Sequence, residues 1–215
     1  MKGLLISFEG TEGGGKSTQV ARLAERLRAE GRRVRLVREP GGTPIGEEIR
    51  FTLKHSPHNG AMTAEAELLL MNASRAQLVR EVIRPALAAG EVVICDRFYD
   101  STVAYQGYGR GLDLGHVNAV IDFAVGETRP QLTLILQVPP AVSQARLAAR
   151  QASLPVVRDR IEEADRSFFE RVEQGYAALA EAEPERIKVI AAEAPEAAVA
   201  AAIWSAVSPW LPSTA

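Results

Sequence analysis

Short apolar runs alternate with amphipathic stretches along most of the chain. Most of these runs are apolar at nearly every position, which is typical of strands covered on both faces of a sheet. One run alternates polar and apolar residues before a Gly- and Pro-rich turn, as a strand with an exposed face does. The five predicted strands are Leu4–Phe8, Arg33–Val37, Val92–Cys95, Leu132–Val138 and Ile187–Ala191.

Apolar residues between these strands recur at the three- and four-residue spacing of helices. The first predicted helix follows a glycine-rich turn and ends at Gly31, and the longest should bend near Pro85. Strands that alternate with helices indicate a five-stranded parallel sheet with helices on both faces. At 215 residues and 47% hydrophobic, the chain is expected to form a single domain. The other predicted helices are Ile45–Leu53, Ala64–Ala89, Leu114–Val125, Ala141–Ala152, Glu162–Glu181 and Glu196–Trp210.

A glycine-rich segment, GTEGGGKS, lies between the first predicted strand and the first predicted helix. It fits the pattern G-x-x-x-x-G-K-S, in which backbone N–H groups converge on phosphate oxygens at a helix start. Lys16 would reach the β- and γ-phosphates of a nucleotide, and Ser17 would ligate Mg²⁺. The predicted phosphate-binding residues are Gly10, Thr11, Glu12, Gly13, Gly14, Gly15, Lys16, Ser17 and Thr18.

Asp96 and Arg97 come directly after the third predicted strand. Ligands of open parallel sheets bind at the carboxyl ends of the strands, which is also where the glycine-rich loop lies. An Asp at this edge can hold Mg²⁺ through water, and an Arg can bind a phosphate bidentately. A structural Asp–Arg pair without a ligand is the alternative.

Four arginines cluster in the stretch from residue 144 to residue 160. They are Arg146, Arg150, Arg158 and Arg160, and Pro155 interrupts any continuous helix. Such a stretch is either a solvated face or a flap whose arginines neutralise charge on a transferred phosphoryl group. The residues alone leave both interpretations open.

Composition argues against several functional classes. A formal net charge of −2 does not suit a protein that mainly coats nucleic acid or an anionic membrane. Cys95 is the only cysteine, which fits a reducing cytoplasm. The apolar run that ends at Glu9 is too short for a secretion signal or a membrane span. The chain also lacks a Gly-x-Ser-x-Gly elbow and an Asn-Lys-x-Asp motif, which weakens the hydrolase and GTPase interpretations.

Several separated motifs together resemble those of bacterial thymidylate kinases. These motifs are FEGTEGGGKST (8–18), REPGGTPIGEEIR (38–50), NASRAQ (72–77), DRFYDSTVAYQG (96–107) and DRIE (159–162). The resemblance implies a P-loop kinase fold with a short lid at about 150–160. It also implies an enzyme that transfers the γ-phosphoryl group of ATP to dTMP with Mg²⁺, and a homodimer.

The resemblance also implies roles for individual residues. Arg97 would bind the dTMP phosphate with help from Arg50, and Arg75 would hydrogen-bond the thymine carbonyl edge. Tyr105 would pack on the deoxyribose. The residues implied to bind dTMP are Glu39, Arg50, Met71, Arg75, Arg97, Thr102, Tyr105 and Gln106.

Glu12 matches a loop carboxylate of this family that contacts the 3′-hydroxyl of the acceptor sugar. Members with this acid place their catalytic arginines in the lid, so the implied catalytic residues are Lys16, Arg97, Glu12, Arg150, Arg158 and Arg160. The implied metal site is Ser17 with Asp96 through water, and Glu9 is expected to have a supporting role near the metal or at the strand end.

Met71 is a departure from the family pattern, because an aromatic residue commonly stacks on the base at this position. A thioether can pack on a ring with about 0.3–1.5 kcal/mol, and a plain core role is the alternative. Two other functions stay open at this point. One is a kinase for another small acceptor, such as dUMP, a deoxynucleoside or a sugar acid, and the other is an ATP-binding regulatory module without turnover.

Overall fold

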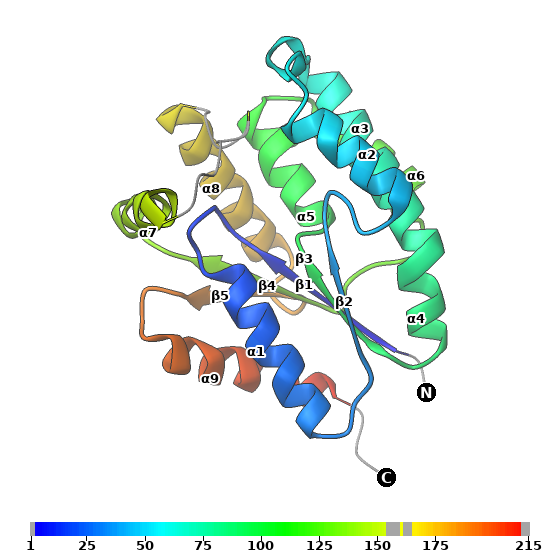
Figure 1. The fold of residues 1–215 in the computed structure, drawn as a ribbon, viewed down its shortest axis with the longest axis vertical. Helices are drawn as coiled ribbons and strands as arrows, with labels where there is room; N and C mark the ends of the chain where they lie inside the picture. Colours follow the sequence, from blue (N-terminus) through cyan, green and yellow to red (C-terminus); the bar gives the residue numbers. More distant parts are fainter. Residues whose placement is uncertain (1–2, 154–159, 161–164, 212–215) are drawn as a thin grey trace.

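The computed structural model describes residues 3–153, 160 and 165–211. Its centre is a parallel sheet of five strands in the order β2-β3-β1-β4-β5 (Figure 1). The strands are β1 (Leu4–Glu9), β2 (Val34–Arg38), β3 (Val92–Asp96), β4 (Leu132–Gln137) and β5 (Ile187–Ala191). The predicted sheet is confirmed, with strand ends shifted by at most one residue.

The register of the sheet brings the predicted phosphate loop beside the end of β3. Phe8 near the end of β1 is opposite Asp96, the last residue of β3, and is also opposite Leu134 of β4. Because the strands are parallel, the segments that follow β1 and β3 leave the sheet at the same edge. Residues about 80 positions apart in the sequence therefore meet there.

Helices account for most of the remaining described residues. They are α1 (Lys16–Ala29), α2 (Pro44–Lys54), α3 (Ala64–Leu78), α4 (Arg84–Ala88), α5 (Tyr99–Thr102), α6 (Leu114–Val125), α7 (Pro140–Ser153), α8 (Arg166–Ala182) and α9 (Glu196–Val207). Four of them begin at a side chain that accepts a hydrogen bond from a first-turn N–H, which satisfies a donor that the helix leaves unpaired. These capping residues are Thr43, Thr63, Asp113 and Asp165.

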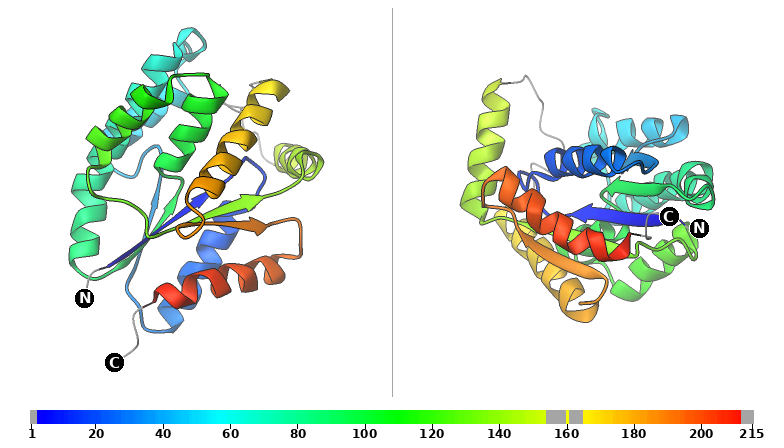
Figure 2. Two further views of the ribbon diagram at one scale, coloured as in Figure 1. Left: turned by 180° about the vertical axis from the view of Figure 1, so that it is seen from behind. Right: turned by 90° about the horizontal axis from the view of Figure 1, so that it is seen from below.

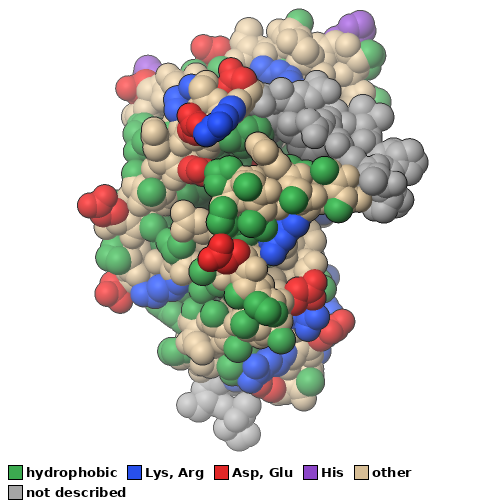
Figure 3. All heavy atoms as spheres, turned by 90° about the vertical axis from the view of Figure 1, so that its left-hand side faces the viewer, with side chains coloured by type: hydrophobic (Ala, Val, Ile, Leu, Met, Phe, Trp, Pro, Cys, Tyr) green, Lys and Arg blue, Asp and Glu red, His purple; other side chains and the backbone are tan. Residues whose placement is uncertain are grey.

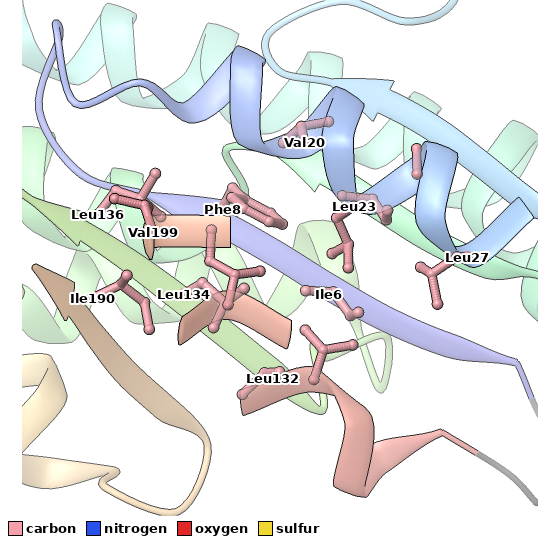
Figure 4. Close-up of a cluster of buried hydrophobic side chains, with 14 of the residues drawn as sticks. Ile6, Phe8, Val20, Leu23, Leu27, Leu132, Leu134, Leu136, Ile190 and Val199 are labelled. Atoms are coloured by element: carbon pink, nitrogen blue, oxygen red, sulfur yellow. The ribbon is translucent and has the colours of Figure 1, made fainter. Parts of the chain in front are cut away.

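Two faces of the sheet carry separate apolar cores. On β1, Ile6 and Phe8 point to one face, where side chains of α1 and α9 pack on them (Figure 4). Leu5 points to the other face and joins a core built with α3, α4 and α6. Figure 2 shows α1 and α9 on one side of the sheet and α3, α4, α6 and α8 on the other, while α7 lies at the edge where β4 ends. The predicted two-sided cover is confirmed.

The predicted helix Ala64–Ala89 is interrupted. A π-helical segment, η2 (Val79–Ile83), separates α3 from α4. Pro85 has no N–H to donate to the carbonyl four residues earlier, and the wider turn lies directly before it. A bend was expected near Pro85, and the structure has a π-helical segment that ends two residues before it.

A helical segment that the sequence analysis did not predict follows β3. It consists of α5 and the π-helical segment η3 (Val103–Gly109). Its glycines serve close packing: a Cβ on Gly109 would lie 2.6 Å from the Phe168 ring of α8. Likewise, a Cβ on Gly175 of α8 would lie 2.9 Å from the Tyr108 ring. These contacts hold η3 and α8 together.

The described helices were compared with the length and apolar character that a membrane-spanning helix needs. Among them, none combines the length and the apolar character needed to span a bilayer. On the face that carries α7, acidic and basic side chains are interspersed with apolar ones (Figure 3). Among the described residues of this face, neither charge forms an extended area.

Candidate functional site

The glycine-rich loop joins β1 to α1 in a conformation that only glycine adopts readily. Gly10 has φ of 120°, and a Cβ there would collide with the Leu136 carbonyl. Gly15 is the N-cap of α1 with φ of 82°. Since Gly15 has no side chain to cap the helix, the first N–H groups of α1 are available for an anion.

Lys16 lies across the loop. Its Nζ donates to the carbonyl oxygens of Gly10 and Thr11, each at 2.9 Å. Burial lowers the pKa of Lys16 to about 8, and the nearby guanidinium of Arg97 lowers it as well. A polyphosphate that replaced the two carbonyls would favour the charged amine.

Ser17 and Asp96 form a short polar pair at the edge of the sheet. The Ser17 hydroxyl donates to Asp96 Oδ2 at 3.0 Å. A hydroxyl and a carboxylate are oxygen ligands that suit Mg²⁺, which usually keeps several waters and takes few protein ligands. The donor set therefore fits the predicted ion. In the part of the chain that the structure describes, no cluster of three or more His, Cys, Asp or Glu residues could form a metal cage.

Arg97 has a left-handed backbone conformation, with φ of 71°, directly after β3. Its guanidinium donates to Glu12 Oε1 at 2.5 Å and to the Tyr105 hydroxyl at 3.2 Å. A second nitrogen donates to the Ser101 hydroxyl at 3.1 Å. Non-glycine residues at positive φ are uncommon and are held by their surroundings, often at functional sites.

Glu12 connects the loop to this arginine. Its Oε2 accepts from the Tyr105 hydroxyl at 2.9 Å, so both carboxylate oxygens are engaged. Burial acts to raise the pKa of Glu12, but Arg97 and Lys16 outweigh it, and the pKa is lowered. Glu12 is thus an ionised acceptor between the loop and the end of β3.

Glu9 is fully buried at the end of β1, and its hydrogen-bond partners include Phe98 and Ser101, which are close to Arg97. Its carboxylate accepts from the Phe98 N–H at 2.7 Å and from the hydroxyls of Ser7, Ser101 and Tyr176. Burial and then Asp100 raise its pKa. These contacts fit the supporting role at the strand end that the sequence analysis considered.

A cavity opens beside Glu12 and Arg97. It brings together most of the residues predicted to bind the acceptor, from four separate stretches of the chain. The predicted residues that line it are Glu12, Glu39, Met71, Arg75, Arg97, Thr102, Tyr105 and Gln106. Arg50 is not among the lining residues, whereas Pro40 is. The Nη1 of Arg50 donates to the carbonyl of Pro40 at 2.8 Å.

Glu39 and Arg75 form a buried ion pair in the wall of this cavity. Arg75 Nη2 lies 2.7 Å from Glu39 Oε2, and each side chain is only 3% exposed. Burial raises the pKa of Glu39 to about 7, although Arg75 opposes this shift. The other oxygen, Oε1, is buried without a hydrogen-bond partner among the described residues, so it could accept from a ligand.

Comparison with known proteins identifies the family of this site. The family model for thymidylate kinase matches residues 8–203. The chain belongs to the thymidylate kinase family. A thymidylate kinase of Synechococcus sp. is 51% identical over 209 residues, which cover 97% of this chain and 96% of that protein. A thymidylate kinase of Deinococcus radiodurans is 48% identical over 209 residues, covering 96% and 97%.

A solved thymidylate kinase structure from Ehrlichia chaffeensis agrees with this family. It has a TM-score of 0.76 and 30% identity, and the match covers 97% of this chain and 99% of that chain. The predicted fold class and the predicted phosphotransferase of nucleotide biosynthesis are therefore confirmed. These comparisons do not assign roles to individual residues, so proposals about those roles depend on the geometry of the site.

Only some of the arginines predicted to lie in the kinase lid are described by the structure. Arg158 and the side chain of Arg150 lie outside the described residues. Arg160 is described, and it donates to the Glu67 carboxylate and to the Met62 carbonyl, the latter at 2.6 Å. Arg146 donates to the Gly13 carbonyl at 3.2 Å, so α7 is bonded to the phosphate loop.

Several residues of this kinase site were missed by the sequence analysis. Tyr176 of α8 donates to Glu9 and receives a bond from Arg97, although it is 79 positions from Arg97. Ser101 is within the quoted DRFYDSTVAYQG motif but had no assigned role. The carboxylate of Glu67 accepts hydrogen bonds from the side chains of Gln106, Arg110 and Arg160. Its spacing of four from Met71, and of eight from Arg75, on one helix face was a usable signal.

Proposed function

We propose that the glycine-rich loop holds the phosphates of ATP while the adjacent cavity holds dTMP, and that the γ-phosphoryl group passes directly between them. The observation that supports this most is the Arg97–Glu12 bridge, because it connects the loop to the cavity. The products are dTDP and ADP. The reaction needs positioning and charge stabilisation and no covalent enzyme intermediate.

On the donor side, Lys16 exchanges its two loop carbonyls for the β- and γ-phosphates, and the N-terminus of α1 adds favourable dipole. Ser17 and, through water, Asp96 would hold Mg²⁺. When bound, Mg²⁺ supplies positive charge that offsets the charge of the phosphates. Glu9 supports this edge from behind by fixing Phe98 and Ser101.

On the acceptor side, Arg97 binds the 5′-phosphate of dTMP and Glu12 accepts from the sugar 3′-hydroxyl. Arg75, Thr102 and Gln106 line the part of the cavity where the base would lie. Tyr105 packs against the deoxyribose, and Met71 packs on the base in place of an aromatic ring. Arg50 assists at the phosphate, while Glu39 holds Arg75 in place through the buried ion pair.

The chain is proposed to be a single kinase domain whose segment at about 150–160 acts as a lid. Arg150, Arg158 and Arg160 would then neutralise charge on the transferred group, because the loop has Gly13, and not an arginine, next to Glu12. Water would be excluded when the lid closes, which suppresses ATP hydrolysis.

The homodimer and the cytoplasmic location are also part of the proposal. Large apolar side chains are exposed on α2, α3 and α6, and α3 packs against both of the other helices. These side chains are Ile45, Phe51, Leu69, Leu114 and Phe123. Phe123, with 84% of its surface exposed, is the extreme case, and burial against a second copy would remove it from water.

The single buried cysteine, Cys95, suits a reducing compartment, which supports the proposed cytoplasmic location.

An acceptor series tests the proposal. ADP release from Mg·ATP is measured by a coupled assay with dTMP, dUMP, UMP, dCMP or thymidine as the acceptor. We expect ADP to appear at a substantial rate only with a deoxypyrimidine monophosphate, with dTMP used best. A clear preference for UMP or for thymidine would overturn the assignment of the acceptor, and an ADP release rate that dTMP does not raise would contradict direct transfer to dTMP.

A further inference from the structure

Glu67 of α3 is a buried carboxylate to which three other side chains donate. Its side chain is 1% exposed. Oε1 accepts from the Gln106 amide nitrogen at 2.8 Å and from Arg110 Nε at 3.1 Å, and Oε2 accepts from Arg110 Nη2 at 3.0 Å. Arg160 also donates to Oε2. A carboxylate buried to this degree is stable only when its oxygens are satisfied in this way.

This carboxylate determines which way the amide of Gln106 faces. An ionised carboxylate only accepts hydrogen bonds, whereas an amide has a donating end and an accepting end. With its NH₂ group held by Glu67, Gln106 has its carbonyl oxygen left for a ligand. Gln106 is 2% exposed and lines the acceptor cavity, so the base of a bound nucleotide would meet this oxygen.

The arrangement distinguishes two kinds of pyrimidine. Thymine and uracil present a carbonyl acceptor beside an N3–H donor, which match the donating Arg75 and the accepting oxygen of Gln106. Cytosine presents an unprotonated N3 and an amino group at these positions, so it would place acceptor against acceptor at Gln106 and donor against donor at Arg75. A site of this kind strongly disfavours a nucleotide that causes such a mismatch, because buried polar groups are then left unpaired.

We propose that Glu67 is a positioning residue that sets the choice of pyrimidine by fixing the amide orientation of Gln106. This inference rests on the proposed function, since it assumes that the base of the acceptor nucleotide occupies the cavity. Glu67 is not among the residues that line the cavity. It acts through Gln106, and it also forms ion pairs with Arg110 and Arg160.

The test is the variant Glu67→Gln, which preserves shape but replaces an acceptor-only group by one that can also donate. The amide of Gln106 can then rotate. We expect the ratio of kcat/KM for dTMP to that for dCMP to fall at least roughly tenfold, with KM for ATP unchanged. A role that is only structural would lower both activities together or lower the unfolding temperature, and an unchanged ratio would overturn the inference.

Two further variants complete the experiment. Arg110→Gln removes a partner of Glu67 but keeps the Glu67–Gln106 bond, so its ratio should stay near that of the wild type. Glu67→Asp keeps an acceptor-only group, so its ratio should stay closer to that of the wild type than a fall of about tenfold. A fall of roughly tenfold or more in folded Glu67→Asp would contradict the inference, and this measurement does not need Glu67→Gln to fold. Wild-type protein that phosphorylates dCMP as well as dTMP would instead contradict the proposed function itself.

Discussion

The guanidinium of Arg97 donates to the carboxylate of Glu12 over 2.5 Å, which joins the end of β3 to the phosphate loop. Each of these two side chains is less than one-fifth exposed. Arg97 also lies over the Tyr105 ring, with its central carbon 5.0 Å from the ring centre. One arginine thus contacts the loop, the cavity wall and the segment η3, so changes on either side of it are expected to separate donor from acceptor effects.

The change Glu12→Gln tests whether the loop acid serves the acceptor. Its amide cannot accept a charge-assisted bond as strongly, and hydrogen bonds to charged groups contribute about 1.5–3 kcal/mol. We expect the KM for dTMP to rise at least roughly tenfold while the Kd of Mg·ATP changes less than about twofold. Steady-state kinetics and calorimetric ATP titration measure the two. An equal loss of ATP affinity would mean that Glu12 belongs to the donor site.

A pH dependence of ATP binding follows from Lys16. In the free protein the pKa of Lys16 is lowered to about 8, whereas bound phosphates favour the charged amine. Between pH 8 and the higher pKa of the complex, binding therefore takes up a proton. The Kd of Mg·ATP should be flat with respect to Lys16 below pH 8 and rise towards roughly tenfold per pH unit above it.

Calorimetry at pH 9 in two buffers of different ionisation enthalpy measures this proton uptake. The control is Lys16→Arg, which stays charged at this pH and should take up no proton at this position. Equal uptake by wild type and Lys16→Arg would show that another group titrates.

A stability prediction comes from the contact between α8 and η3. In Gly175→Ala the new Cβ would lie 2.9 Å from the Tyr108 ring and 3.0 Å from the Ala104 Cα, which forces the two elements apart. We expect a loss of about 1–3 kcal/mol in the free energy of unfolding. The KM for dTMP should also rise, since η3 carries Tyr105 and Gln106.

Urea unfolding and steady-state kinetics measure the two effects. The matched control is Gly60→Ala, because no heavy atom lies within 4 Å of a Cβ built there. If Gly175→Ala is as stable as Gly60→Ala, the close packing of η3 on α8 does not limit stability.

Local pattern was sufficient to predict the strands and the phosphate loop. Each strand is a short apolar run, and the loop needs its glycines at fixed spacing whatever surrounds it. The helix Leu114–Val125 was predicted with its observed ends, since Asp113 caps its first turn and Gly126 follows its last. Such features depend on residues that are close in sequence.

Contacts between distant segments could not be predicted in the same way. Tyr176 reaches Glu9 only because α8 packs on η3, and no periodicity encodes that approach. The segment η3 itself was missed because Gly107 and Gly109 resemble helix breakers, whereas here they permit close approach of neighbouring side chains. The partners of Glu67 depend on the same non-local packing, so its role emerged only from the structure.

Arg97 carries the central claim, because it is the one side chain proposed to bind the acceptor phosphate at the point of transfer. The most direct test is therefore the steady-state kinetics of Arg97→Ala with Mg·ATP and dTMP, alongside its thermal unfolding and its Kd for ATP. Arg22→Ala is the control, since its ion pair with Glu196 is exposed and lies away from the cavity.

We predict that kcat/KM for dTMP falls at least about a hundredfold in Arg97→Ala, as expected for the loss of a charged group that stabilises the transferred phosphoryl. The Kd of Mg·ATP should stay within about threefold of the wild-type value, and the protein should remain folded. Near-normal turnover of dTMP by folded Arg97→Ala would contradict the account.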